Sequence, residues 1–173
     1  MIATKRILST LIIFLLLIAG LYAWLPARPF PPSSIDRIVV IKSQHCMMLM
    51  HQDQIIKSYT VSLGRGSAAA KIREGDHRTP EGSYTIDWRN PQSRFHRSLH
   101  VSYPNSKDRQ IAKDLGVAPG GDIMIHGLHH RLGWMGRFHR WVDWTDGCIA
   151  VTNSEMDQLW NAIPDGTSIE IRP

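Results

Sequence analysis

The chain has 173 residues, which is the size of one ordinary domain, so an assembly of several large domains is excluded. Apolar residues make up 43% of it and charged residues 20%, a composition that excludes a disordered chain and predicts a domain with its own hydrophobic core. The formal net charge is +5, which favours acidic partners.

The first element in chain order is an apolar segment behind two basic residues. Lys5 and Arg6 precede an uncharged run from Ile7 to Leu25, close to the roughly 20 residues that a helix needs to cross a bilayer. Positive residues tend to stay in the cytoplasm, so everything after this run is expected across the membrane. We predict that residues 1–25 are an N-terminal membrane anchor, or a signal segment, in the cell inner membrane, with the following domain exported to the periplasm. The alternatives are a cleaved signal peptide, for which only poor cleavage sites are present, and a buried core helix.

A linker over residues 26–35 is predicted next. Its four prolines favour a stiff, extended spacer that holds the domain off the lipid surface. An exported basic domain meets anionic lipid head groups and cell-wall carboxylates, so no nucleic-acid partner is expected.

Short strands dominate the rest of the pattern. Asp53 is typical of a hairpin turn between two of them, and Gly64 to Gly82 is predicted to be a long loop because it is rich in glycine, proline and charge. The strand candidates are residues 38–41, 47–50, 55–63, 83–88, 98–103 and 167–171.

Two helices are predicted among the strands. The first covers residues 107–115 and ends at Gly116, and the second follows Thr152, whose spacing from Glu155 matches a capping box. Many strands with one or two short helices predict a mainly β domain over residues 36–173, either a small β-sandwich or a barrel-like sheet.

The residues whose side chains are most suited to catalysis lie between Ile123 and Asn153. An apolar, strand-like stretch leads to His126, and a glycine, Gly147, stands directly before Cys148. Glycine keeps bulk away from a neighbouring thiol and lets the backbone turn sharply, while a histidine nearby can accept the thiol proton. The second ring nitrogen of His126 needs a partner, for which Gly127 C=O, Asp143 and Asp146 are the candidates.

Other interpretations of these residues stay open. Cys148 and His126 can be a structural cysteine and a core histidine, and Cys46 can pair with Cys148 in a disulfide. His126, His129 and His130 suggest a zinc site completed by an aspartate, but Gly127 interrupts the continuous helix face on which such ligands usually lie.

The motif His126-Gly127 followed by Thr145-x-Gly147-Cys148 resembles the signature of the L,D-transpeptidase catalytic domain, a YkuD-like family of the ErfK/YbiS type. Two upstream stretches, Val61 to Gly64 and Glu74 to Tyr84, also resemble blocks of this family, so the likeness runs from about residue 36 to residue 173.

The resemblance implies a cysteine acyltransferase that works on the stem peptides of peptidoglycan. The thiol of Cys148 would attack the carbonyl before the terminal D-Ala of a tetrapeptide stem, and an amine of another stem would then take the acyl group. His126 would act as general base and acid, and the backbone at Gly147 and Cys148 would hold the oxyanion. Carboxypeptidase or hydrolase use of the same thiol, a zinc-dependent peptidase and a non-catalytic peptidoglycan-binding module are the alternatives. No metal or organic cofactor is implied.

Two features depart from the family pattern. Many members carry an arginine two residues after the cysteine, where this chain has Ala150, and the segment before Thr145 is a few residues longer than usual. We predict that this segment, residues 128–144, is a lid that binds stem-peptide carboxylates, or else a basic surface loop with one or two aromatic residues packed inward. Its basic and aromatic residues are Arg131, Trp134, Arg137, Phe138, His139, Arg140, Trp141 and Trp144. The predicted substrate-binding residues are Thr145, Asp146, Arg137 and Trp144.

Overall fold

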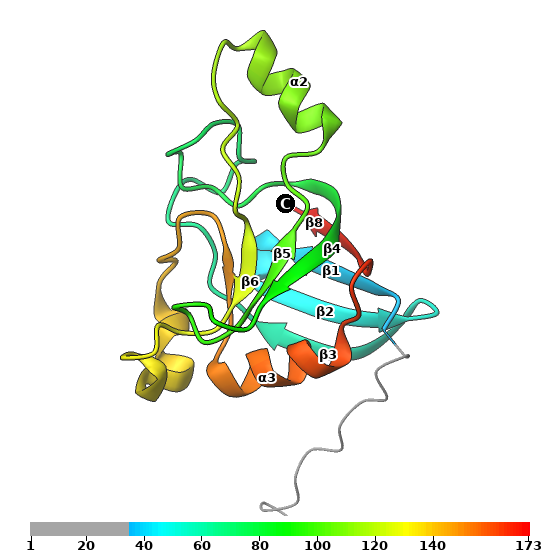
Figure 1. Cartoon of the computed structure of the whole chain (residues 1–173), viewed down its shortest axis with the longest axis vertical. Helices are drawn as coiled ribbons and strands as arrows, with labels where there is room; N and C mark the ends of the chain where they lie inside the picture. Colours follow the sequence, from blue (N-terminus) through cyan, green and yellow to red (C-terminus); the bar gives the residue numbers. More distant parts are fainter. Residues whose placement is uncertain (1–34) are drawn as a thin grey trace, which may run out of the picture.

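The computed structural model describes residues 35–173 (Figure 1). The predicted membrane anchor, residues 1–25, and all but the last residue of the predicted linker lie outside the described residues. Within 35–173, none of the helices has the length and apolar character that crossing a membrane requires.

A single eight-stranded sheet forms the body of the domain, with the strand order β3-β2-β1-β8-β4-β5-β6-β7. The sheet curls into a half-barrel, so of the two forms expected from the sequence the barrel-like one is found (Figure 1). The strands are β1 (Arg37–Ile41), β2 (Cys46–His51), β3 (Gln54–Thr60), β4 (Gly82–Asn90), β5 (Ser98–Val101), β6 (Met124–His126), β7 (Ile149–Ala150) and β8 (Ser168–Arg172).

The first three strands form an antiparallel meander, and β8 returns to pair in parallel with β1. The predicted turn at Asp53 is confirmed, because Gln52 and Asp53 both adopt positive φ between β2 and β3. The predicted strand 55–63 ends earlier, at Thr60. Beyond it the chain crosses to another partner, since Ser62 exchanges two backbone hydrogen bonds with Ala150.

Helix α2 (Ser106–Asp114) and helix α3 (Asn153–Ala162) occupy the two predicted helical regions. The capping box predicted for α3 is confirmed, because Thr152 and Glu155 satisfy each other's backbone N–H groups. The buried face of α3 carries Met156 and Leu159, and the helix contacts β5 and β6. This packing supports the strands that end at the candidate site.

Three short elements were not predicted. Residues Lys42–Gln44 form a 3₁₀ turn, and Ile149–Ala150 form strand β7. Residues Gly133–Trp141, expected to be an irregular loop, form two 3₁₀ turns joined at Gly136, whose φ is 48°. No hydrophobic period marks these pieces, because each is shorter than the repeat that sequence patterns detect.

Candidate active site

His126 is the last residue of β6, and Cys148 directly precedes β7, the neighbouring parallel strand at one edge of the sheet. In the β6–β7 pair, Ile125 faces Ile149 and His126 faces Ala150. Successive side chains point to opposite faces of a strand, and both isoleucines are fully buried in the core. His126 and Cys148 therefore share the other face as diagonal neighbours.

His126 is buried and held by its own neighbour. Its Nδ1 lies 2.6 Å from Gly127 O, so of the three partners considered from the sequence the carbonyl is the one in contact. A carbonyl only accepts, so Nδ1 carries the proton and Nε2 keeps a lone pair. Burial lowers the pKa of His126 to about 4, against a smaller opposing effect of the Gly127 carbonyl. The ring is therefore neutral at pH 7 and able to accept a proton at Nε2.

Two aromatic rings enclose this histidine. The ring of Phe95 lies 4.7 Å from that of His126, and the ring of Trp144 lies 5.6 Å away. Trp144 also contacts Phe95, at 6.1 Å between centroids. Phe95 and Trp144, far apart in the sequence, thus form the apolar wall that desolvates His126.

Cys148 carries a protonated thiol. Burial raises the pKa of Cys148 to about 11, against a backbone hydrogen bond from Met124 that lowers it. The negative charges of Asp146 and Asp122 raise the pKa further. The Sγ atom lies 3.5 Å from Asp122 O, to which the thiol donates. Cys46 and Cys148 are both free, so the disulfide alternative is not the state found.

The turn that carries Cys148 is fixed by one hydroxyl. Thr145 Oγ1 donates to Cys148 O at 2.7 Å and accepts from Gly147 N at 3.2 Å. Gly147 adopts φ +124°, and a Cβ on it would lie 2.7 Å from Arg78 O. Only glycine fits this place, because both the backbone angle and the close approach of another chain segment exclude a side chain.

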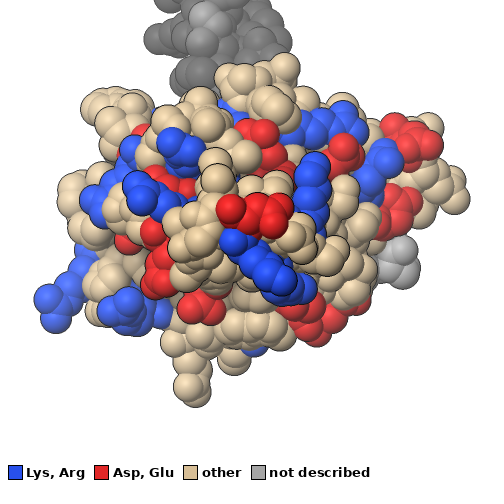
Figure 2. All heavy atoms as spheres, turned by 90° about the horizontal axis from the view of Figure 1, so that it is seen from above, with Lys and Arg blue, Asp and Glu red and all other residues tan. Residues whose placement is uncertain are grey.

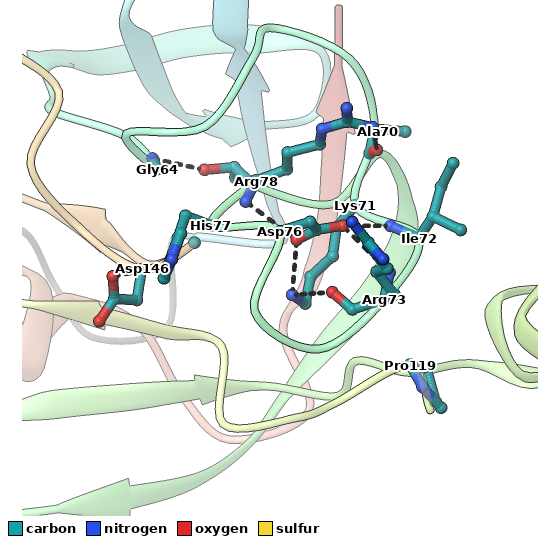
Figure 3. A network of polar contacts seen from close by, with 12 residues as sticks. Gly64, Ala70, Lys71, Ile72, Arg73, Asp76, His77, Arg78, Pro119 and Asp146 are labelled. Carbon is teal, nitrogen blue, oxygen red and sulfur yellow. Dashed lines mark hydrogen bonds and ion pairs between the residues drawn. The ribbon is translucent and has the colours of Figure 1, made fainter. Parts of the chain in front are cut away.

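The segment that approaches Gly147 is organised by the buried carboxylate of Asp76 (Figure 3). Its oxygens accept from the backbone N–H groups of Ile72, Arg73 and Arg78, and from Lys71 Nζ at 2.9 Å. Burial by itself would raise the pKa of Asp76, but these four donors outweigh it and lower the pKa to about 2. Asp76, which lies in the stretch from Glu74 to Tyr84 noted in the sequence, therefore shapes the loop that supports the turn carrying Cys148.

Asp143 and Asp146 bind elsewhere rather than to His126. Asp143 accepts from Leu63 N at 2.7 Å and lies 2.9 Å from His45 Nε2. Asp146 is exposed and pairs with Arg65 at 2.9 Å and with His77 at 2.8 Å, as the close view of this region shows for His77 (Figure 3). These two residues connect the chain just before Cys148 to His45 and to the segment from Leu63 to His77.

Ala150 is fully buried, and its backbone partner Ser62 contacts His139. Ser62 pairs with Ala150 through the backbone, and its Oγ lies 3.1 Å from His139 Nδ1. Burial, assisted by the charge of Arg140, lowers the pKa of His139 to about 4. Its Nε2 is buried with no hydrogen-bond partner in the described part of the chain. The long segment 128–144 thus delivers His139 to Ser62, the backbone partner of Ala150.

The other predicted residues of segment 128–144 lie apart from the thiol. Arg137 lines a separate hollow near the start of α3, with Tyr59 and Glu155 among its walls. Arg140 pairs with Glu155 rather than with solvent. Trp134 and Trp141 are 80% and 79% exposed, whereas Trp144 packs inward against His126 and Phe95, as expected for a surface loop with one or two aromatic residues facing inward. His139 and Trp144 are the members that reach the catalytic face. Among residues 35–173 no three His, Cys, Asp or Glu side chains gather closely enough to hold a metal ion.

Sequence reasoning missed four residues of this site: Ser62, Phe95, Asp76 and Asp122. Asp76 and Ser62 stood in stretches that were noted only as family blocks, and Phe95 and Asp122 carry no local signal. They come together because the sheet places strands and loops from distant parts of the chain at one edge.

Comparison with known proteins locates the same region. A family model described as the L,D-transpeptidase catalytic domain matches residues 35–171. The chain is 29% identical over 115 residues to the Escherichia coli K12 protein named "Putative L,D-transpeptidase YafK". That match covers 65% of this chain and 39% of the relative, so the chain spans well under half of the relative's length.

Solved structures with the same fold include larger proteins. The helical cell shape determining protein Pgp2 from Campylobacter jejuni superposes with a TM-score of 0.61 at 21% identity, over 80% of this chain and 47% of that one. The L,D-transpeptidase from Xylanimonas cellulosilytica gives a TM-score of 0.54 at 18% identity, over 84% and 64%. At these identities the likeness establishes the fold.

Proposed function

The chain belongs to the L,D-transpeptidase catalytic domain family, and we propose that it is an exported acyltransferase of peptidoglycan stem peptides with Cys148 as nucleophile and His126 as base. One observation carries the assignment. A neutral histidine, oriented through Nδ1 by Gly127 O, lies on the same face of the sheet as the thiol, one strand away.

The resting states of the two groups define the first step. Cys148 is a thiol and His126 is a neutral imidazole at pH 7, so no stable ion pair precedes the reaction. As Sγ attacks the stem carbonyl before D-Ala, the thiol proton passes to His126 Nε2 and an S–C bond forms. The thiol gives up its hydrogen bond to Asp122 O to do so.

The oxyanion of the tetrahedral intermediate needs a donor close to Sγ. The Gly147 N–H is already bound to Thr145 Oγ1, which leaves the Cys148 N–H as the donor that we assign to the oxyanion. Collapse breaks the bond to D-Ala, whose amine takes the proton from His126, and leaves a thioester.

The second half of the reaction uses the same groups in reverse order. An amine of another stem attacks the thioester carbonyl, and His126 Nε2 accepts its proton. The S–C bond then breaks, the proton returns to Sγ, and a new amide remains. Water in place of the amine gives a carboxypeptidase, so the outcome depends on which nucleophile reaches the thioester first.

The proposal is tested by incubating the full chain, purified in detergent, with tetrapeptide muropeptides and following the products by mass spectrometry. We expect loss of D-Ala together with cross-linked dimers, and none of either with Cys148→Ala. Cys46→Ser is the matched control, because it removes the other free thiol and should leave turnover intact. Turnover that persists in Cys148→Ala would overturn the assignment, and D-Ala release without dimers would identify the carboxypeptidase.

The location of the reaction is part of the proposal. The apolar run from Ile7 to Leu25 behind two basic residues supports an inner-membrane anchor with the domain on the periplasmic side. Protease digestion of intact spheroplasts tests this, because an exported domain is degraded while a cytoplasmic one is protected.

A further inference from the structure

Segment 128–144 presents an apolar surface of a kind that the rest of the described domain lacks. Nine large hydrophobic side chains in residues 35–173 are exposed, and five of them fall between residues 132 and 142. They are Leu132, Trp134, Phe138, Trp141 and Val142, which we call the aromatic surface. Contiguous exposed apolar groups are uncommon on soluble proteins and usually mark a contact with another molecule or a membrane.

Part of the aromatic surface surrounds a hollow. Leu132, Phe138 and Val142 all line a hollow of about 260 Å³, together with Met135. Phe138 and Trp141 contact each other edge to face, with ring centroids 5.2 Å apart. The lining of the hollow is almost wholly apolar. A sugar would leave its hydroxyl groups unpaired there, whereas a hydrocarbon chain would not.

Basic charge borders this surface. The segment holds three arginines and one acid, Asp143. Arg140 is paired with Glu155 and Asp143 with His45, which leaves Arg131 and Arg137 exposed. Neither of these two has an ion pair within residues 35–173. By contrast, basic and acidic groups are interspersed over the face seen from the α2 end (Figure 2).

The predicted membrane anchor, together with a short linker, would keep this surface close to a bilayer. The predicted linker of ten residues reaches at most about 35 Å when fully extended. In Figure 1 the segment 128–144 lies toward the lower end of the domain, the end at which the described chain begins and opposite to α2. A short tether from that end therefore holds the aromatic surface within reach of the membrane.

We propose that the aromatic surface docks on the membrane, with Trp134, Phe138 and Trp141 at the level of the head groups and Arg131 and Arg137 on anionic lipid phosphates. Tryptophan side chains are enriched at this depth because one end of the ring is apolar and the other is a hydrogen-bond donor. Arginines beside an apolar face add attraction to anionic lipids. A second copy of the chain fits less well, because a two-fold interface would set the unpaired arginines against their own copies.

The docking is independent of the transpeptidase reaction, and so is its test. The full chain carrying Trp24→Phe, which removes the tryptophan of the predicted anchor, is reconstituted in vesicles of phosphatidylcholine and phosphatidylglycerol with brominated acyl chains. Bromine quenches indole emission only at short range. We expect quenching relative to unbrominated vesicles, and we expect it to be lost with Trp134→Ser/Trp141→Ser.

Trp88→Ser is the matched control, because Trp88 is an exposed tryptophan on β4, outside the segment. It should leave the quenching unchanged. Quenching that survives the double substitution, or that Trp88→Ser abolishes, would overturn the proposal.

The charge component is tested in the same vesicles. Arg131→Gln/Arg137→Gln should lower the quenching in anionic vesicles to the level seen with phosphatidylcholine alone, and Lys107→Gln/Lys113→Gln on α2 should not. Two other results would contradict membrane docking: self-association in detergent that depends on the two tryptophans, which identifies a second copy, and protection of those tryptophans by muropeptides, which identifies the substrate.

Discussion

The cysteine turn and segment 128–144 lie close together in the fold but are built in opposite ways. The turn is fixed by Thr145 Oγ1, by the approach of Arg78 to Gly147 and, behind that, by four donors to Asp76. Segment 128–144 consists of two short 3₁₀ turns whose largest side chains face solvent. The contrast indicates that the first region holds reacting atoms in place, while the second is a surface made for contact.

The largest effect is expected at the base. His126→Gln keeps a polar side chain of similar reach but removes the group that accepts the thiol proton, and we expect turnover to fall by roughly 10²–10⁴-fold. Single-turnover release of D-Ala, followed by mass spectrometry, measures the loss. A rate within a factor of a few of the unmodified chain would show that another group takes the proton.

The same histidine sets the acid side of the pH profile. The pKa of His126 is about 4, below its ordinary value, so the ring remains neutral and active down to that range. We expect kcat/KM to fall as the pH drops through about 4, and an inflection near 6.5 would mean that His126 is solvated during catalysis.

The next largest effect is expected at Asp76, which organises the loop that packs against Gly147. Asp76→Asn removes the negative charge beside Lys71, whose side chain is buried with it, and leaves an unpaired buried cation. We expect a loss of about 3–5 kcal/mol in the free energy of unfolding. Thermal unfolding followed by near-ultraviolet circular dichroism tests it, with the α2 variant Asp114→Asn as control, since the Asp114 partner Gln110 is uncharged and exposed.

The lowered pKa of Asp76 also makes stability depend on pH. Its folded pKa, about 2, lies below the unfolded value of 3.8, so its contribution is fully present above about pH 4. It is lost as the pH falls toward 2, because the unfolded chain binds the proton first. In Asp76→Asn this part of the acid transition should be absent.

A smaller effect is expected within the turn itself. Gly147→Ala forces a side chain into φ +124° and toward Arg78 O, which we expect to cost about 1–3 kcal/mol of stability and to slow acylation. Gly121→Ala is the matched control, because its Cβ would meet open space at an ordinary backbone angle. Equal behaviour of the two variants would show that the turn is not strained by a side chain.

The smallest effect is expected in segment 128–144. Trp134→Ser/Trp141→Ser removes two large rings that make little contact with the domain, and we expect the free energy of unfolding to change by less than about 0.5 kcal/mol. A loss of several kcal/mol would mean that the aromatic surface packs against the domain, and the contrast with the cysteine turn would fail.

Local patterns in the sequence were sufficient for most of the secondary structure. The hairpin at Asp53 and the capping box at Thr152 were predicted because each depends on a few adjacent residues. The end of β3 at Thr60 was not, because Ser62 beyond it pairs with Ala150, which is 88 positions away in the sequence. Strand β7 was not either, because its two residues form a strand only by pairing with β6.

The sequence by itself determined the family, through His126, the Thr-x-Gly-Cys motif and the upstream Gly-Asp block, because motif residues are readable one by one. Only the tertiary structure decided which oxygen orients His126, that burial raises the pKa of Cys148 and lowers that of His126, and that Trp134, Phe138 and Trp141 face outward while Trp144 packs inward. Each of these depends on burial and on contacts between distant segments, and a linear pattern of residues records neither.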